Sequence, residues 1–181
     1  VLDAALDYAL HAVHLDPTDA RGFGELGFIR LNRREHDAAI NDYEHALSLN
    51  PNDADLMTDM ADALLFCGRS KDSVGLMKRA MRLNPFYPDT YNWCLGSAYY
   101  DIKRYDEAVR TLLRMHNPTE GRRILAASYA QLGKLDEAKE QVTRFLEVYP
   151  DFSLVEWSKS VPEKYEENLD HVVDGLRKAG L

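Results

Sequence analysis

The sequence predicts an all-α fold in which one helix–turn–helix unit repeats along the chain. A first observation is a set of prolines that recur with spacings of 34, 34, 33 and 32 residues: Pro17, Pro51, Pro85, Pro118 and Pro150. A second is that apolar and small residues between these prolines follow the three- and four-residue spacing of a helix face. A fixed period of this length is typical of repeat architectures, which stack equivalent units side by side.

The block from Ala20 to Pro51 illustrates the unit. A first helix is indicated by the face Phe23, Leu26, Gly27 and Arg30, and a second by Ala39, Ile40, Tyr43, Ala46 and Leu47. Small residues such as Gly27 and Ala39 allow the two helices to approach closely. The closing Asn50-Pro51 ends the second helix, because proline suits a first helical turn but not a helix interior.

The same register divides the whole chain. We expect an array over residues 1–150, made of a half repeat (1–17) and four repeats (18–51, 52–85, 86–118 and 119–150). Residues 151–181 follow a different rhythm, with a short helix before Pro162 and a last amphipathic helix. A terminal segment of this kind is expected to cap the apolar end of the stack.

The chain resembles the tetratricopeptide-repeat (TPR) family. The resemblance is carried best by Leu95-Gly96-Ser97-Ala98-Tyr99-Tyr100, Tyr105-Asp106-Glu107-Ala108 and Gly133-Lys134-Leu135-Asp136-Glu137-Ala138. It implies a right-handed superhelical solenoid whose first helices line the concave side. It also implies a non-catalytic scaffold that binds proteins or peptides in a concave groove.

Two departures from the family pattern are informative. Arg30 occupies a position where the family usually has an aromatic residue, so we expect that interface to be looser or repacked. The second helix of the repeat at 86–118 is about two residues short. In addition, Val1 opens in the middle of a helical pattern, so we expect the first helix of the half repeat to lie upstream.

Composition excludes several classes of protein. The net charge of −8 argues against nucleic acid as the main partner. No apolar run is long enough to cross a bilayer, and no signal-like start is present. The only two cysteines, Cys67 and Cys94, cannot form a disulfide scaffold, so we expect a cytoplasmic protein with both cysteines packed inside repeats.

Motifs that carry chemistry have simpler explanations here. The run Gly22-Phe23-Gly24-Glu25-Leu26-Gly27 matches a dinucleotide-binding pattern, but a helix precedes it where that pattern needs a strand. His11 and His14 have a chelating spacing without a third ligand nearby. No catalytic motif is present. We therefore expect no enzyme activity, no cofactor and no metal.

Carrying over the family's register gives a candidate peptide-binding groove. Its residues are Phe28, Asp55, Asp59, Asp62, Phe66, Trp93, Ser97, Tyr100, Asp101, Arg123 and Gln131. Aromatic anchors beside aspartates favour a protein or peptide partner with basic and apolar side chains. The alternative for Trp93 and Tyr100 is that they pack between repeats. Some relatives clamp a C-terminal carboxylate, but those positions hold Gly24, Phe28, Thr58 and Asp62, which do not suit it.

Two further hypotheses stay open. The tail, from Phe152-Ser153-Leu154 to Gly180-Leu181, is similar to the C-terminal end of bacterial class III adenylate/guanylate cyclases of rhizobial type. That similarity implies a regulatory module of a signalling enzyme. Alternatively, the apolar face formed by Leu2, Leu6, Leu10 and Val13 could support a homodimer.

Overall fold

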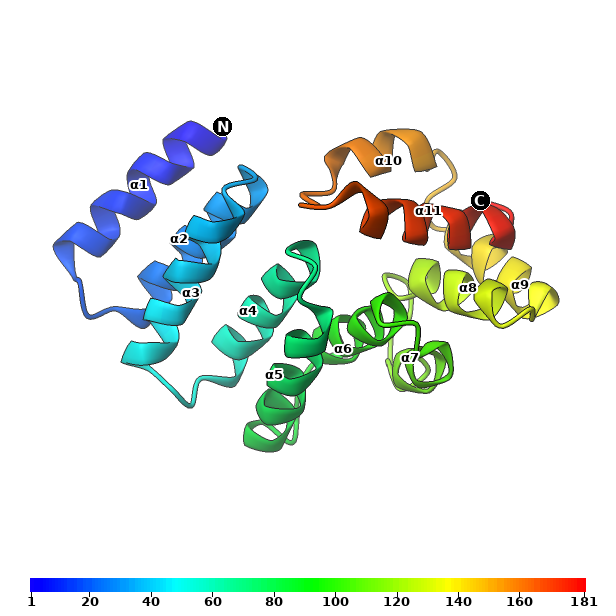
Figure 1. The fold of residues 1–181 in the computed structure, drawn as a ribbon, viewed down its shortest axis with the longest axis horizontal. Helices are drawn as coiled ribbons and strands as arrows, with labels where there is room; N and C mark the ends of the chain where they lie inside the picture. Colours follow the sequence, from blue (N-terminus) through cyan, green and yellow to red (C-terminus); the bar gives the residue numbers. More distant parts are fainter. The chain divides into compact units, whose positions relative to one another are not determined.

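A computed structural model describes all residues, 1–181, and contains eleven α-helices and no strand. The all-α prediction is confirmed (Figure 1). The chain forms two compact units, residues 1–86 and 87–181, and each is described by itself. None of the helices is long and apolar enough to span a membrane.

The first unit, hereafter unit 1, holds five helices: α1 (Leu2–Leu15), α2 (Ala20–Asn32), α3 (His36–Leu49), α4 (Ala54–Phe66) and α5 (Ser70–Leu83). Helix α2 packs against α3, and α4 packs against α5, as antiparallel pairs of a repeat. Their core includes Leu31, Ile40, Tyr43 and Leu64. Gly27 is required there, because a Cβ atom would lie 2.9 Å from the Tyr43 ring.

The second unit, hereafter unit 2, holds six helices: α6 (Asp89–Asp101), α7 (Tyr105–Leu112), α8 (Arg122–Gln131), α9 (Leu135–Leu146), α10 (Leu154–Ser160) and α11 (Glu166–Ala179). Helix α7 has only 8 residues, against 14 for α3 and α5, so it is shortened as expected, but by more than the two residues predicted. Helix α11 packs mainly against α8 and touches α6 and α9.

The turns within the four helix pairs share one geometry. Each places a single residue in the left-handed region, with φ between 61° and 75°: Arg34, Gly68, Lys103 and Gly133. The next amide then donates back to a carbonyl five residues earlier, for example Glu35 N to Arg30 O at 2.9 Å. This hydrogen bond closes the helix C-terminus as a Schellman motif and turns the chain into the second helix.

Arg30 repacks the interface where the family pattern has an aromatic residue. Its Nη1 atom donates to Oδ2 of Asp42 at 2.7 Å, and Asp42 is buried. Burial raises the pKa of the Asp42 carboxyl, although Arg30 opposes that rise. The α2–α3 interface therefore contains a partly buried ion pair in place of an aromatic contact, which is one of the two outcomes expected for that position.

Both cysteines, Cys67 and Cys94, are buried, which agrees with their expected place in the packing. The glycines of the dinucleotide-like motif lie at or near the start of α2 and within it. At Gly24, a Cβ atom would lie 2.5 Å from Leu56, so close helix packing explains this glycine. No group of three or more potential metal-ligating side chains comes together in the chain.

Candidate functional site

The residues predicted to line one groove divide between the two units. Unit 1 carries five of them on α2 and α4: Phe28, Asp55, Asp59, Asp62 and Phe66. Unit 2 carries six on α6 and α8: Trp93, Ser97, Tyr100, Asp101, Arg123 and Gln131. The two sets differ in what covers them.

In unit 2, the last helix covers part of the predicted groove. Tyr100 is fully buried, and its hydroxyl donates to the carbonyl of His171 on α11 at 2.9 Å. The Tyr100 ring also stacks on the His171 ring, with centroids 4.7 Å apart. Gln131 Nε2 donates to Asp174 of α11 at 3.2 Å. Tyr100 therefore does not line an open groove, because α11 packs on it.

Three other predicted groove residues of unit 2 also serve packing. Ser97 is buried, and Trp93 packs partly buried against the core formed by Val109, Leu112, Met115 and Leu125. The guanidinium of Arg123 lies over the rings of Phe145, Phe152 and Trp157, at 4.8 to 5.6 Å from their centroids. Burial lowers the pKa of Arg123. Because Ser97 is buried, its side chain is not open to solvent.

Unit 1 has a different arrangement, because a cavity of about 210 Å³ opens between α2 and α4. Phe28, which is 55% exposed, forms part of its rim, and the buried Tyr43 and Leu56 form its apolar lining. The remaining lining residues are Arg21, Gly24, Glu25 and Asp59. Two residues expected in the groove, Phe28 and Asp59, thus meet at one cavity, whereas Phe66 packs against the core of unit 1.

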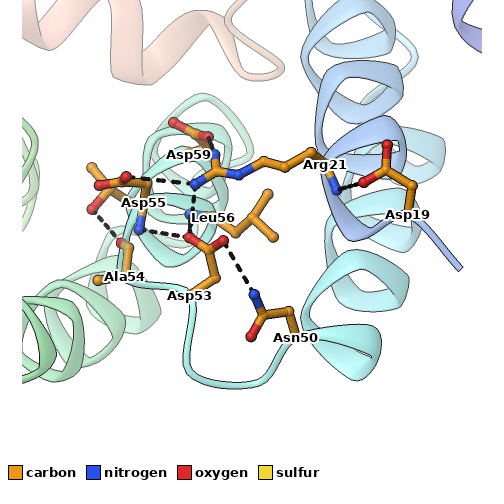
Figure 2. A network of polar contacts seen from close by, with 9 residues as sticks. Asp19, Arg21, Asn50, Asp53, Ala54, Asp55, Leu56 and Asp59 are labelled. Carbon is orange, nitrogen blue, oxygen red and sulfur yellow. Dashed lines mark hydrogen bonds and ion pairs between the residues drawn. The ribbon is translucent and has the colours of Figure 1, made fainter.

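A network of carboxylates holds Arg21 beside this cavity (Figure 2). Arg21 Nη2 lies 2.9 Å from Asp53 and 3.5 Å from Asp55, and Nη1 lies 3.9 Å from Asp59. Asp53 is also the N-cap of α4, because its side chain accepts from the amides of Asp55 and Leu56. Helix capping therefore fixes one wall of the network.

The acidic side chains near the cavity have raised pKa values. The pKa of Asp59 is raised to about 6: burial is the largest cause, Arg21 opposes the rise, and Asp55, Glu25 and Asp53 add to it. Burial also raises the pKa of Asp62 to about 7, with a contribution from Asp59. Atom Oδ1 of Asp62 is buried without a hydrogen-bond partner. These carboxylates would gain from a cation.

Sequence reasoning missed several residues of this site. Arg21 and Glu25 lie one turn apart on α2. Asp53 precedes α4 as its N-cap, so it lies outside the helix face from which the groove was predicted. Tyr43 belongs to the family pattern as a packing residue, yet it also lines the cavity. A signal was available for Arg21, because it lies in the first turn of its helix and the first helix of the next repeat carries Asp55, Asp59 and Asp62.

Family comparisons agree with this architecture. One tetratricopeptide-repeat model matches residues 31–92, and a second matches residues 124–151. The chain contains tetratricopeptide repeats. No curated protein sequence matches it significantly.

Solved structures of TPR proteins share the fold. TTC0263, a thermophilic TPR protein of Thermus thermophilus, is 22% identical over 97% of this chain and 91% of its own, with a TM-score of 0.72. YrrB, a TPR protein described as having an unusual peptide-binding site, is 21% identical over 97% and 92%, with a TM-score of 0.64. MamA of Desulfovibrio magneticus RS-1 is 16% identical over 82% and 86%, with a TM-score of 0.69. The all-α TPR solenoid is thereby established as the fold class.

Proposed function

We propose that this TPR chain is a non-catalytic protein-interaction module that binds a basic and apolar peptide segment on the α2–α4 face of unit 1. The observation that carries the proposal is the cavity between these helices, which combines the exposed ring of Phe28 with carboxylates. Interfaces depend on such anchors, because a buried aromatic contact supplies much of the binding energy.

Charge supports the same partner chemistry. Asp55 and Asp59 have side chains that are 58% and 51% exposed, so a partner can reach them. A basic segment would be attracted to this face over about 10 Å at moderate salt, and the attraction would weaken as salt rises. The similarity to YrrB adds a precedent for peptide binding by a protein of this fold.

The test begins with a displayed peptide library selected on the immobilised 181-residue chain. Enriched peptides are synthesised, and their affinity is measured by fluorescence anisotropy for wild type, Phe28→Ala and the double variant Asp59→Lys/Asp62→Lys. We expect basic and apolar peptides, with about tenfold or greater loss of affinity in both variants. Circular dichroism checks that helicity is unchanged.

A matched control separates local contacts from net charge. Glu44 on α3 and Glu147 at the end of α9 are exposed, and Glu44→Lys/Glu147→Lys makes the same change of net charge away from the cavity. It should leave peptide affinity within about twofold of wild type. If the peptides bind the α2–α4 variants as tightly as they bind the wild-type protein, the binding face lies elsewhere. A selection that enriches no peptide would overturn peptide binding itself.

A regulatory role behind a signalling domain, such as a class III cyclase, is a second proposal. It rests on the similarity of the segment from Phe152 to Leu181 to the tails of such enzymes. The coding sequence upstream of Val1 tests it directly: a cyclase domain there would support it, and an unrelated domain would contradict it.

Self-association is a third proposal, based on α1. Leu2 and Leu10 are 42% and 40% exposed, and Tyr8 and Leu15 are 77% and 71% exposed. Sedimentation velocity at micromolar concentration is the test. A dimer that dissociates in the Leu10→Glu variant would support association through α1, and a monomer at every concentration would contradict it.

A further inference from the structure

The acidic network of unit 1 already binds one guanidinium, that of Arg21. Three aspartates surround it, within 2.9 to 3.9 Å, while the Arg21 side chain remains 49% exposed. Planar guanidinium groups pair well with several carboxylates at once, because their N–H groups form a fixed fork. The network is therefore suited to this cation, and its internal occupant is accessible to solvent and to a competitor.

The cavity beside Arg21 has the size for one side chain. Pockets that hold small molecules have volumes of about 300–1,000 Å³, whereas this cavity measures about 210 Å³. Its apolar lining of Leu56 and Tyr43 suits the methylene stem of a long side chain, and the Phe28 ring offers a face to a cationic tip. An arginine side chain combines these two properties.

Charge near the cavity is unbalanced. Glu25 and Asp59 line the cavity, and Arg21 is the only cation among the lining residues. Arg21 is also paired with Asp53 and Asp55. Asp62 does not line the cavity, but its carboxyl interacts electrostatically with Asp59, and its buried Oδ1 atom has no hydrogen-bond partner. A second cation would therefore be stabilised here.

We propose that the cavity binds the side chain of an arginine from the partner, and that Arg21 competes with that arginine for the same carboxylates. The inference rests on the proposed function and specifies its partner chemistry. Arg21 lines the cavity, so its positive charge repels an incoming cation and occupies Asp59. Arg21 thus sets a threshold: only a side chain that pairs with the carboxylates and also fills the apolar cavity displaces it.

Arginine is favoured over lysine for two reasons. A guanidinium stacks on an aromatic ring and presents several donors in one plane, whereas an ammonium is a compact and strongly hydrated charge. The cavity places an aromatic ring, Phe28, and two carboxylates, Glu25 and Asp59, around one space. Citrulline has nearly the same shape as arginine but carries no charge, so it separates electrostatic recognition from apolar filling.

Binding should also depend on pH. The charged and titratable groups of the cavity and its network are Arg21 and Glu25 on α2, Tyr43 on α3, and Asp53, Asp55 and Asp59 at α4. Asp62 on α4 interacts electrostatically with Asp59 and Tyr43. The pKa of Asp59 is about 6 and that of Asp62 about 7, so both lose charge as the pH falls from about 8 to about 5. Affinity for a cation should fall over the same range.

The experiment is an NMR titration of the full chain, labelled with ¹⁵N, with the capped dipeptide acetyl-leucyl-arginine amide. Matched probes replace arginine by citrulline or lysine. With the arginine probe we expect the largest shift changes at the amides of Gly24, Glu25, Phe28 and Asp59. We expect about tenfold weaker binding for citrulline, and weaker binding of the arginine probe at about pH 5 than at about pH 8.

Arg21→Gln gives the sharper result. Loss of the competitor should tighten binding of the arginine probe by about threefold or more, whereas Arg82→Gln, which removes the same charge from the exposed end of α5, should change it little. Equal binding of arginine and citrulline, an absence of localised shifts, or weaker binding by Arg21→Gln would overturn the inference. If selected peptides lack arginine but are lost with Phe28→Ala, the proposed function stands and this inference fails.

Discussion

The two units use the same repeat but treat the corresponding faces of their first helices differently. In unit 1, the α2–α4 face keeps a cavity, with Phe28 and Asp59 accessible. In unit 2, α11 packs on α8 and α6, and Tyr100 is fully buried beneath it. The repeat register therefore identifies the residues on a face, whereas segments outside the register decide whether that face is open.

The chemistry of the two faces follows this difference. The open face of unit 1 carries an excess of carboxylates around one arginine, which favours a partner from outside. On the covered face of unit 2, the Tyr100 hydroxyl bonds to His171, and Gln131 bonds to Asp174 and Lys178 of the same helix, whereas Ser97 Oγ and the Nε and Nη1 atoms of Arg123 are buried without a hydrogen-bond partner. An internal helix thus takes the contacts that a partner would make there.

The largest expected effect concerns the packing of α11 on α6 and α8 in unit 2. In Gly175→Leu, the added Cβ would lie 2.3 Å from the Tyr100 hydroxyl and 2.9 Å from the Ala127 Cβ, so α11 must shift or detach. We expect a loss of about 3 kcal/mol in the free energy of unfolding, measured by urea denaturation. The matched control is Gly75→Leu, because Gly75 on α5 has no neighbour within 4 Å of an added Cβ. It should be neutral or stabilising.

A second prediction concerns the partly buried ion pair of Arg30 and Asp42 in unit 1. Arg30→Ala leaves the buried Asp42 carboxylate without its partner. We therefore expect the free energy of unfolding, measured by urea denaturation, to fall by about 2 kcal/mol at about pH 8. The pKa of Asp42 is raised in the folded state, so a fall in pH makes the buried carboxyl neutral and removes the need for a partner. The loss of stability caused by Arg30→Ala should therefore be smaller at about pH 5. The double variant Arg30→Met/Asp42→Leu should lose less than Arg30→Ala does. A double variant that is less stable than Arg30→Ala would contradict this explanation.

A smaller effect links the open face of unit 1 to stability. The pKa of Asp59 is raised from 3.8 to about 6 on folding, so the folded state holds its proton more tightly than the unfolded state does. Lowering the pH from about 7 to about 4 therefore stabilises the fold through this group, and its charge is destabilising above about pH 6. Because the side chain is half exposed, Asp59→Asn should raise the free energy of unfolding by only about 0.5 kcal/mol at about pH 8.

The control for this prediction is the same comparison at about pH 4, where Asp59 is protonated in the folded state. Wild type and Asp59→Asn should then unfold at nearly the same temperature. A variant that is less stable than wild type at about pH 8 would mean that the pairing of Asp59 with Arg21 outweighs the cost of its burial.

Much of the fold follows from local rules in the sequence. The recurring prolines and the small residues predict the helix pairs, because Gly27 and Ala39 mark where the two helices of a pair approach. The short α7 is also visible in the proline spacing. The repacked contact at Arg30 is foreseen only as a departure, since its partner Asp42 lies on the following helix and is identified by three-dimensional contact alone.

The candidate site could be predicted less completely. The register places Phe28 and Asp59 on one face, and they do line one cavity. It could not reveal that α11 packs on Tyr100, because that contact joins residues 71 positions apart and lies outside the repeat period. Nor could it assign Arg123, whose aromatic contacts Phe152 and Trp157 belong to the tail.

Hydrogen–deuterium exchange of the full chain, with and without the tightest peptide from the library selection, tests the central claim most directly. A partner that binds the open face of unit 1 should slow amide exchange in Ala20–Asn32 and Ala54–Phe66, and leave Arg122–Gln131 and Glu166–Ala179 unchanged. Protection confined to α8, or faster exchange in α11 on binding, would contradict it, because the peptide would then occupy the face that α11 covers.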